Sequence, residues 1–476
     1  MDSPRSPQPT ADLSTLLNQS RFQPFHFKAL LASSLGFFTS AYDLFIIGTA
    51  LVLIREQWHL SADEVGLIGS ISLIATFVGA YLFGHLGDKL GRKKIYGIEA
   101  TLMTGGALLS AFAPNVSVLI LARVILGLGI GGDYALSAVL MSEYANRQSR
   151  GRMVSLVFSA QALGLVLGPA VALALLGAGT PHALAWRIML GLGALPAFAV
   201  IFVRRTLPES PRWLAQVKGD AKGATESLRK LGVQSRAVVR VLPPGERPRL
   251  WQYKWTLLGT AGTWFLFDYA YYGNTISTPM ILEKLAPHAQ LLQSTALSLL
   301  VFATAAVPGY LLAILTIDRI GHKRLQLWGF ALLSLAFLTI GLFPVVSESL
   351  IAFLVLYGVS YFFSEFGPNT TTFVLASELY PTHLRTTGHG ISAGTAKVGA
   401  FLGAFLFPVL LATLGLDKTL LLTGFFGVAG FFLTALLLPE PAGKTLEELS
   451  VAHSGSGQRE DNETEETGER VMRTRA

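Results

Sequence analysis

Long apolar stretches alternate with short polar segments between about residues 28 and 439. Twelve of these stretches are long enough to cross the roughly 30 Å hydrocarbon core of a bilayer as helices. Their approximate centres are Phe45, Ala75, Met103, Leu128, Leu165, Leu195, Phe267, Leu300, Leu335, Tyr361, Leu402 and Phe425. The pattern predicts an all-α membrane protein with twelve transmembrane helices in two six-helix bundles, residues 28–204 and 255–439.

Three polar segments flank and divide these bundles. Residues 1–27 are rich in Pro, Ser and Gln and lack an uninterrupted apolar core, so we expect a flexible N-terminal tail and no cleavable signal peptide. Residues 205–254 are charged and contain prolines, which is typical of a central loop between the bundles. Residues 440–476 form a C-terminal tail that ends in an acidic polar run, which predicts disorder.

The distribution of Lys and Arg predicts the orientation in the membrane. If both termini are cytoplasmic, the inner loops carry 23 of these residues, twelve of them between Arg204 and Lys254. The outer loops carry four, which are Arg55, Arg187, Lys284 and Lys418. The positive-inside rule therefore predicts cytoplasmic termini and a cytoplasmic central loop. A bacterial inner membrane and a eukaryotic plasma membrane both stay open.

Composition excludes several classes of protein. Hydrophobic residues make up 51% of the chain and charged residues 14%, whereas a soluble domain carries about 25% charge. The net charge of +7 does not indicate nucleic-acid binding, because the basic residues lie between apolar blocks. With no cysteine in the chain, thiolate metal sites and disulfides are excluded, and we expect no metal site.

Two glycine motifs resemble those of enzymes. The Gly127-x-Gly129-x-x-Gly132 pattern fits a dinucleotide fingerprint, and Gly390-x-Ser392 with the next glycine fits a nucleophile elbow. Both lie within apolar spans with no strand before them, so we expect neither a Rossmann site nor a hydrolase. A Walker lysine motif is also lacking. The sequence therefore predicts no enzyme and no cofactor.

Two charged loop patterns occur once in each half of the chain. An Asp follows the second and eighth spans close to a glycine and basic residues, and a Glu after the fourth and tenth spans precedes an Arg by seven residues. The charged members are Asp88, Arg92, Glu143 and Arg150 in the first half, and Asp318, Glu378 and Arg385 in the second. Halves with internal repeats and a binding site between them are typical of secondary transporters. Alternatively, such loops arise from topology alone.

These loop motifs resemble those of the major facilitator superfamily, and the resemblance covers nearly the whole chain. An Asp that pairs with Arg and is joined to a Glu of a neighbouring helix forms a charge-assisted lock. We therefore predict that the seven loop residues form a cytoplasmic gate. The segment Pro208-Glu-Ser-Pro-Arg-Trp-Leu214 adds a resemblance to the sugar-porter-like branch, although it also fits an amphipathic surface helix in the central loop.

Ionisable residues within the spans need a function, because each costs about 2.5–3.5 kcal/mol at mid-bilayer on insertion scales. Six qualify: Asp43, Arg123, Asp133, Asp268, Glu365 and Lys397. Four acids face two bases, so two carboxyl groups are expected to carry a proton part of the time. Such groups are typical of proton coupling. For Arg123 and Glu365, structural ion pairs between helices are an equal alternative.

The seventh span combines three polar side chains on one helical face. Trp264, Asp268 and Tyr272 are spaced four residues apart, and all three can donate hydrogen bonds when the acid is protonated. A row of hydrogen-bond donors on one helix face is suited to binding an oxyanion. Tyr134 and Asn369 precede the repeated Glu residues by nine positions each, which places them at matching depths. Gln161 and Lys397 follow the two repeated Arg residues by eleven and twelve positions, so we expect one converging pocket.

The segments Gly131-Gly-Asp-Tyr-Ala-Leu-Ser-Ala-Val-Leu-Met-Ser-Glu-Tyr-Ala-Asn146, Tyr42-Asp-Leu-Phe-Ile-Ile-Gly48 and Gly367-Pro-Asn-Thr-Thr-Thr-Phe373 resemble the phosphate:proton symporter family. By this resemblance, phosphate is bound by Tyr134, Gln161, Trp264, Asp268, Tyr272, Asn369 and Lys397, with Asp133 beside them. Asp43 and Asp133 are implied in proton passage, together with Asp268. Ala135 departs from the family, which usually has Pro there, and the central loop is shorter than in fungal relatives.

The resemblance implies proton-coupled import of inorganic phosphate by alternating access, in a lipid bilayer and as a monomer. Lys397 would attract the anion, and Asp268 would be protonated or hydrogen-bonded to a protonated phosphate oxygen when substrate is bound. Two alternatives stay open. One is a carrier of another solute, such as an organic anion, a phosphate ester or a sugar, and the other is a sensor that binds solute without moving it.

Overall fold

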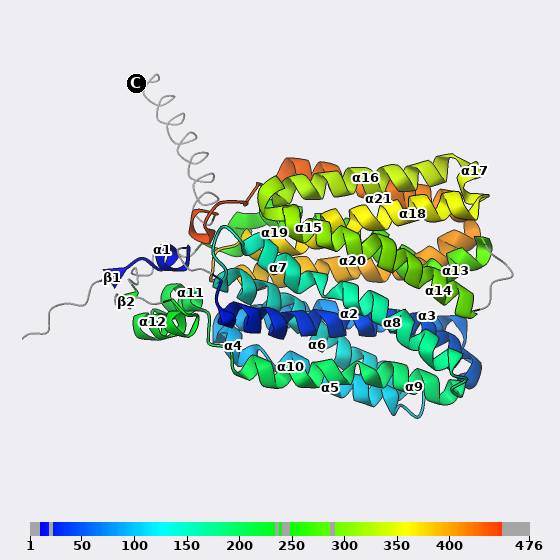
Figure 1. Ribbon diagram of the computed structural model, residues 1–476, viewed down its shortest axis with the longest axis horizontal. Coiled ribbons are helices and arrows are strands. Elements are labelled where there is room, and N and C mark those ends of the chain that lie inside the picture. Colours follow the sequence, from blue (N-terminus) through cyan, green and yellow to red (C-terminus); the bar gives the residue numbers. More distant parts are fainter. Residues whose placement is uncertain (1–9, 19–21, 234–237, 240–247, 286–290, 450–476) are drawn as a thin grey trace, which may run out of the picture.

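The computed structural model describes residues 10–18, 22–233, 238–239, 248–285 and 291–449. Its long helices run side by side along one axis, and the helices of the two halves of the chain lie next to each other (Figure 1). The helices of the first half are α2 (Pro24–Trp58), α3 (Ala62–Leu90), α4 (Arg92–Ile95), α5 (Ile98–Ala111), α6 (Val116–Tyr144), α7 (Arg150–Ser159), α8 (Gln161–Gly177), α9 (His182–Leu192) and α10 (Ala194–Arg205).

The second half follows the same order of long helices. Its elements are α13 (Lys254–Leu285), α14 (Leu291–Val301), the π-helical η3 (Phe302–Ala306), α15 (Val307–Ile320), α16 (His322–Leu342), α17 (Pro344–Ser347), α18 (Leu350–Ser364), the π-helical η4 (Glu365–Asn369), α19 (Thr370–Glu378), α20 (Arg385–Thr413) and α21 (Leu416–Leu437). Two of the long membrane helices are therefore interrupted by π-helical segments, which often occur at functional sites.

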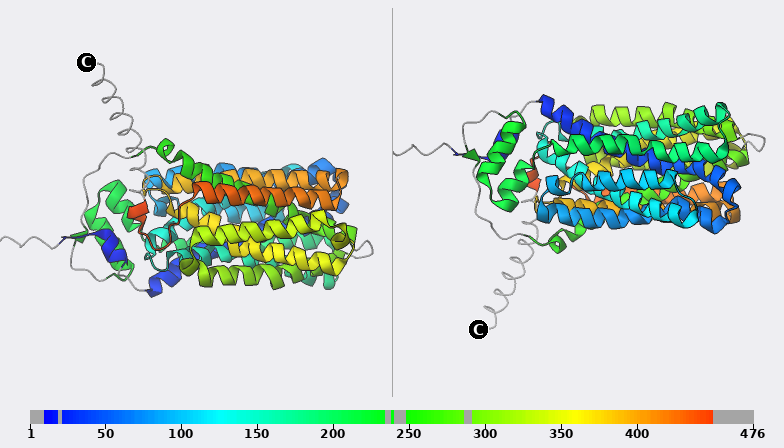
Figure 2. Two further views of the ribbon diagram at one scale, coloured as in Figure 1. Left: turned by 90° about the horizontal axis from the view of Figure 1, so that it is seen from above. Right: turned by 90° about the horizontal axis from the view of Figure 1, so that it is seen from below.

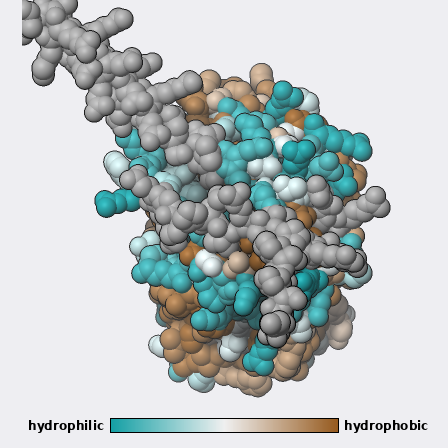
Figure 3. Space-filling view, turned by 90° about the vertical axis from the view of Figure 1, so that its left-hand side faces the viewer, coloured by the Kyte–Doolittle hydropathy of each residue, from teal (hydrophilic) through white to brown (hydrophobic). Residues whose placement is uncertain are grey.

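Small elements lie beyond one end of the long helices, called here the central-loop end (Figure 2). They are α1 (Leu13–Asn18), α11 (Pro211–Trp213), η1 (Leu214–Lys218), α12 (Ala221–Lys230) and η2 (Leu250–Tyr253). Strands β1 (Thr10–Ala11) and β2 (Val238–Val239) pair in parallel and tie the N-terminal segment to the central loop. Figure 3 views this end and shows hydrophilic residues across much of it, with hydrophobic residues along the side of the molecule.

Ten helical stretches of the described residues are long and apolar enough to span a bilayer. The two other expected spans correspond to α5, which has 14 residues, and to α13, where Asp268 and several hydroxyl and amide side chains interrupt the apolar sequence. The twelve expected centres all fall within these helices. The acidic run of the C-terminal tail lies outside the described residues.

Helix ends follow from local sequence. Ser61 and Glu64 form a capping box at the start of α3, with the Glu64 carboxylate 2.9 Å from the Ser61 backbone N. At the other end of α3 the chain turns at Gly91, where φ is +96°, and the repeated loop turns at Gly321, where φ is +106°. Glycine tolerates this backbone conformation without a steric cost. The two repeats therefore share a turn as well as charges.

A Glu after the sixth and the twelfth span accepts hydrogen bonds at each of these turns. Glu209 accepts from the backbone N of Arg92 at 3.0 Å, and Glu440 accepts from the backbone N of His322 at 2.8 Å. Both glutamates follow a Leu-Pro pair, a third internal repeat that the sequence analysis missed. Burial raises the pKa of Glu209, although nearby backbone N–H groups and Arg92 act in the opposite direction.

Candidate functional site

Lys397 of α20 forms the centre of a buried polar cluster between the two halves. Its Nζ lies 2.8 Å from Oδ2 of Asp268 and 2.9 Å from the hydroxyl of Tyr272. The same ammonium lies 4.7 Å from the ring centroid of Tyr134 and 4.3 Å from that of Tyr272. All four side chains are buried. A cation therefore contacts aromatic residues of both bundles and one carboxylate.

The predicted row on α13 faces this cluster. Trp264 is fully buried one turn before Asp268, and its ring lies 6.2 Å from that of Tyr134 in α6. Tyr272, one turn after Asp268, stacks on Phe45 of α2 with ring centroids 6.0 Å apart. Residues of α2 and α6 in the first half therefore pack directly on the polar face of α13.

A hydrogen-bond chain extends the cluster to the remaining predicted residues. Gln161 donates from Nε2 to the Tyr134 hydroxyl at 2.5 Å, and the Tyr310 hydroxyl lies 3.5 Å from Oε1 of Gln161. Asn369 donates from Nδ2 to the Tyr310 hydroxyl at 2.9 Å. The structure thus brings together all seven residues predicted to bind substrate. Tyr310 of α15 is an additional member, which no sequence signal distinguished from other aromatic residues of the spans.

In the first half, Asp133 is more completely paired than the sequence suggested. It forms an ion pair with Arg204 and accepts from Ser137 at 2.6 Å. Arg204 also pairs with Glu99 of α5, 2.6 Å from Nη1. From the sequence, Arg204 was the last residue of the first bundle but its charge was counted with the loop, and Glu99 was not included among the charged residues of the spans. The loop count was wrong for Arg204, because α10 continues to Arg205 and the Arg204 side chain is buried in the bundle.

Arg123 does not form the ion pair that was considered as an alternative for it. Arg123 donates to the backbone carbonyl of Asp43 at 3.4 Å and to Ser72 at 3.2 Å. Both carboxylate oxygens of Asp43 are buried and lack a hydrogen-bond partner within the part of the chain that the structure describes. The carboxyl group lies beside Gly193, where an added Cβ would collide with it.

Glu365 also lacks the ion pair considered as an alternative. It is fully buried in η4, and its Oε2 accepts from Asn369 at 2.5 Å. No Lys or Arg within the described residues pairs with it. Away from the gate, and counting Glu99 and Arg204, five buried acids of the described membrane helices face three buried bases, so two of these carboxyl groups still exceed the available cations.

The predicted gate residues meet at the central-loop end, and each Arg of the Glu-Arg repeat crosses to the other half. Arg150 lies 2.9 Å from Glu378, and Arg385 lies 3.0 Å from Glu143. The sequence predicted the members of this lock but not the exchange between halves. Spacing along the chain cannot distinguish a contact within one half from a contact with its repeat.

Further contacts of the two loops add to this lock. Arg92 lies 3.1 Å from Asp88 and 3.0 Å from Glu143, and it donates to the backbone carbonyl of Thr382 at 2.7 Å. Burial alone would lower the pKa of Arg92, but Glu143 and Asp88 raise it overall. In the second loop, Asp318 accepts from the backbone N of Arg152 at 3.0 Å. These contacts join the two halves at the central-loop end.

Comparisons with known proteins agree with this architecture. A family model described as "Sugar (and other) transporter" matches residues 28–453. Inorganic phosphate transporter 1-11 of Oryza sativa subsp. japonica is 32% identical, over 93% of this chain and 90% of the relative. Probable inorganic phosphate transporter 1-6 of Arabidopsis thaliana is 34% identical, over 91% of this chain and 95% of the relative.

Among solved structures, the major facilitator superfamily proton:xylose symporter XylE bound to 6-bromo-6-deoxy-D-glucose has a TM-score of 0.76 at 21% identity. The alignment covers 90% of this chain and 99% of that chain. The predicted fold class, an all-α membrane protein with two helical bundles, is confirmed. The chain therefore belongs to the sugar (and other) transporter family and is a multi-pass membrane protein with the major facilitator fold.

Proposed function

We propose that the protein imports inorganic phosphate together with protons, by alternating access across a cell membrane. The observation that carries this proposal is the buried Lys397 ammonium, which pairs with the Asp268 carboxylate and the Tyr272 hydroxyl of the second half and lies against the Tyr134 ring of the first half. A buried anion requires a cation and hydrogen-bond donors. Relatives that are 32–34% identical over most of the chain are named inorganic phosphate transporters, which supports phosphate as the anion.

The ion pair between Lys397 and Asp268 links the anion to a proton. In the structure, the Asp268 carboxylate forms an ion pair with the Lys397 ammonium. A phosphate that approached Lys397 would face this negative charge at close range. Protonation of Asp268 removes the charge, frees the ammonium for phosphate and turns the carboxyl group into a donor. Substrate loading and proton loading at Asp268 therefore favour each other.

The remaining parts of the site have defined roles in this proposal. Asp43 and Asp133 relay protons in the first bundle, and the buried gate at the central-loop end closes the cytoplasmic side while the site faces outward. Both termini and residues 205–254 are placed in the cytoplasm. The transporter acts as a monomer in a bacterial inner membrane or a plasma membrane, and it moves solute without covalent catalysis.

Uptake of labelled phosphate into proteoliposomes tests the proposal. With an imposed gradient that is acidic outside, we expect concentrative uptake that a protonophore abolishes. Xylose, sulfate and glycerol phosphate serve as competitors, because the family model includes sugar carriers and other anions could occupy a cationic site. Efficient competition by one of these solutes, with weak self-competition by phosphate, would identify another cargo. Binding without counterflow would instead indicate a sensor.

A Lys397→Gln variant tests the role of the cation. Loss of one charge-assisted contact costs about 1.5–3 kcal/mol, so phosphate affinity should fall roughly 10–100-fold. Lys418→Gln is the matched control because Lys418 is exposed, and it should retain wild-type affinity. Isothermal titration or competition against labelled phosphate measures the change. An unchanged affinity in Lys397→Gln would remove Lys397 from the binding site.

A further inference from the structure

Glu365 is a buried acid of the second half that the mechanism above does not use. It begins the π-helical segment η4, which contains Pro368 and ends at Asn369, and Gly367 within it departs from helical geometry with φ −110° and ψ −109°. Widening of a helix by a π-turn changes which side chains share a face. Glu365 and Asn369, four residues apart within this segment, contact each other, with 2.5 Å between the amide N and the carboxylate O.

The surroundings of Glu365 contain no compensating base among the described residues. The titratable groups that face it are the hydroxyls of Tyr271 and Tyr272 on α13, Tyr310 on α15 and Tyr361 on α18. Helix α16, which also packs on η4, contributes the neutral Gln326 and Gly329. Oε1 of Glu365 is buried without a hydrogen-bond partner in the described part of the chain. An ionised carboxylate in this place would be uncompensated.

On one side, Glu365 connects to the proposed phosphate site. Asn369 donates from the same Nδ2 to Glu365 and to Tyr310, and Tyr310 reaches Gln161. An ionised Glu365 accepts a hydrogen bond from the Asn369 amide. A protonated Glu365 no longer needs that donor and can itself donate through its O–H. The protonation state of Glu365 therefore changes how many donors Asn369 and Tyr310 can offer to a substrate.

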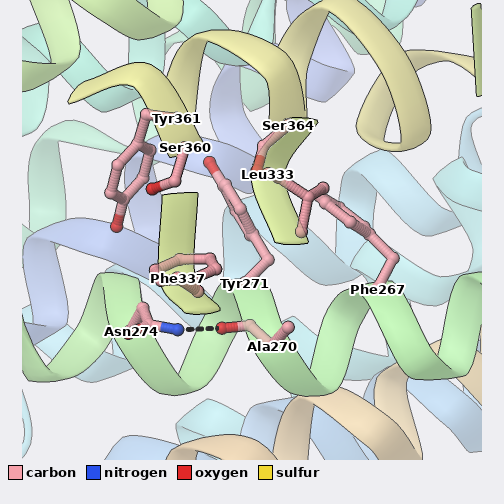
Figure 4. Close-up of a pocket in the computed structure, with 9 residues that line it drawn as sticks. All are labelled: Phe267, Ala270, Tyr271, Asn274, Leu333, Phe337, Ser360, Tyr361 and Ser364. Atoms are coloured by element: carbon pink, nitrogen blue, oxygen red, sulfur yellow. Dashed lines mark hydrogen bonds between the residues drawn. The ribbon is translucent and has the colours of Figure 1, made fainter. Parts of the chain in front are cut away.

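On the other side, a small cavity is lined by Ser364, the residue before Glu365, and by Tyr271 (Figure 4). It has room for about one water molecule and is lined by Phe267, Ala270, Tyr271, Asn274, Leu333, Phe337, Ser360, Tyr361 and Ser364. Figure 4 shows Tyr271 extending across the cavity from α13 toward α18, which carries Ser360 and Ser364. The Tyr271 hydroxyl faces the Glu365 carboxylate, and Oδ1 of Asn274 is a buried polar atom without a hydrogen-bond partner in the described residues.

Hydroxyl pairs continue from this cavity toward the end of the molecule opposite the central loop. The Tyr361 hydroxyl donates to Thr275 at 2.8 Å. Closer to the start of α18, the Tyr357 hydroxyl lies 3.0 Å from Oγ1 of Thr278. Tyr357 is seven residues from Leu350 at the start of α18, or about 10 Å along the helix. Hydroxyl groups both donate and accept hydrogen bonds, so this row can pass a proton.

We propose that Glu365 is a second proton-carrying site, separate from Asp268, which is loaded from the outer side through the hydroxyl row and emptied to the cytoplasm in each transport cycle. The inference rests on the proposed function and adds a proton to its stoichiometry. In the outward-facing state, a proton from external water bonds to the Glu365 carboxylate. In the inward-facing state, that O–H bond breaks and the proton enters cytoplasmic water. Nothing is oxidised or reduced.

The coupling ratio of a Glu365→Gln variant tests this proposal. Glutamine keeps the shape and a hydrogen-bonding carbonyl but cannot release a proton. In proteoliposomes without a membrane potential, one coupled proton contributes a tenfold accumulation per pH unit at equilibrium. We expect Glu365→Gln to carry one proton fewer per phosphate, which lowers accumulation about tenfold at a gradient of one unit, while phosphate counterflow persists. Glu365→Asp should keep the wild-type ratio.

Glu348→Gln is the matched control, since Glu348 is an exposed glutamate before α18, and it should behave as the wild type. Two results overturn the inference: an unchanged proton-to-phosphate ratio in Glu365→Gln, or loss of counterflow together with accumulation in a folded Glu365→Gln protein, which would make Glu365 a binding or structural residue. Failure of the proposed function is distinguishable, because the wild type itself would then not couple phosphate to the gradient.

Discussion

Two buried acid sites, one in each bundle, have opposite surroundings. In the first bundle, Asp133 and Glu99 share the guanidinium of Arg204. In the second bundle, Glu365 has only neutral partners, namely an amide and tyrosine hydroxyls. Both acid sites are fully buried, so burial does not distinguish them. The difference lies in whether the neighbouring sequence supplies a base.

This difference determines what each site can do. A carboxylate that shares a buried Arg is stabilised in its charged form, and a proton that binds there must weaken an ion pair. A carboxylate without a base is neutralised most readily by a proton. The first arrangement suits a relay in which Arg204 exchanges partners, and the second suits a group that carries its proton through the membrane. Variants at each site can separate these roles.

The largest effect is expected for Arg204→Met, which leaves Asp133 and Glu99 buried without their cation. Removing one partner of a buried ion pair costs about 3–5 kcal/mol, so the purified protein should unfold at a clearly lower temperature or fail to accumulate. Scanning fluorimetry in detergent measures the midpoint. Arg205→Met is the control, because the adjacent Arg205 is exposed. Equal stability of the two variants would contradict the charge compensation assigned to Arg204.

A smaller and more specific effect is expected for Asp133→Asn. Glu99 still pairs with Arg204 in this variant, so the fold should persist, but Asp133 can no longer exchange a proton. Proton-driven phosphate accumulation should fall to the level of the gradient-free control, while some binding remains. Ser137→Ala removes the hydroxyl that donates to Asp133 and keeps the carboxyl group, so it should retain accumulation. Full active uptake by Asp133→Asn would remove it from the proton path.

The smallest effect concerns the gate. Each half contributes one Glu–Arg pair to it, but the two glutamates differ in the basic side chains that remain beside them when the paired Arg is removed. After Arg150→Gln, His322 at 3.6 Å is the one basic side chain left beside Glu378 among the residues that the structure describes. After Arg385→Gln, Glu143 still holds Arg92 at 3.0 Å. We therefore expect Arg150→Gln to open the cytoplasmic side more, with a shift of about 1–3 kcal/mol in the conformational equilibrium.

Labelling of an introduced cysteine measures this opening. The chain contains no natural cysteine, and Ser142→Cys would place a thiol at the buried junction where Ser142 contacts the backbone of Ser377. Combined with Arg150→Gln, this thiol should react several-fold faster from the central-loop side. Arg152→Gln is the control on the same helix, because Arg152 is exposed. Faster labelling with Arg385→Gln than with Arg150→Gln would reverse the proposed order of the two contacts.

Much of the site could be predicted from periodicity. Trp264, Asp268 and Tyr272 recur at every fourth position, which places them on one face of any helix. Matching the two repeats placed Tyr134 and Asn369 at the same depth in the membrane, because each lies nine residues before the repeated Glu of its half. Tyr310 and Glu99 were missed for a physical reason: neither belongs to a repeat or to a spaced motif, and only contact with another helix gives it a role. Arg204 was misplaced because a helix end cannot be located within a residue or two from sequence.

By itself, the sequence determined the class of the protein, its membrane helices and the residue types available for an anion and for protons. These properties depend on local hydrophobicity and on spacing within a helix, and both can be read directly from the order of the residues. Only the tertiary structure decided which charge compensates which. The exchange of Arg150 and Arg385 between halves, the capture of Arg204 by two acids and the isolation of Glu365 all depend on packing between distant helices. In a low-dielectric interior, the few ångströms set by that packing determine whether a carboxyl group is an ion-pair partner or a proton carrier.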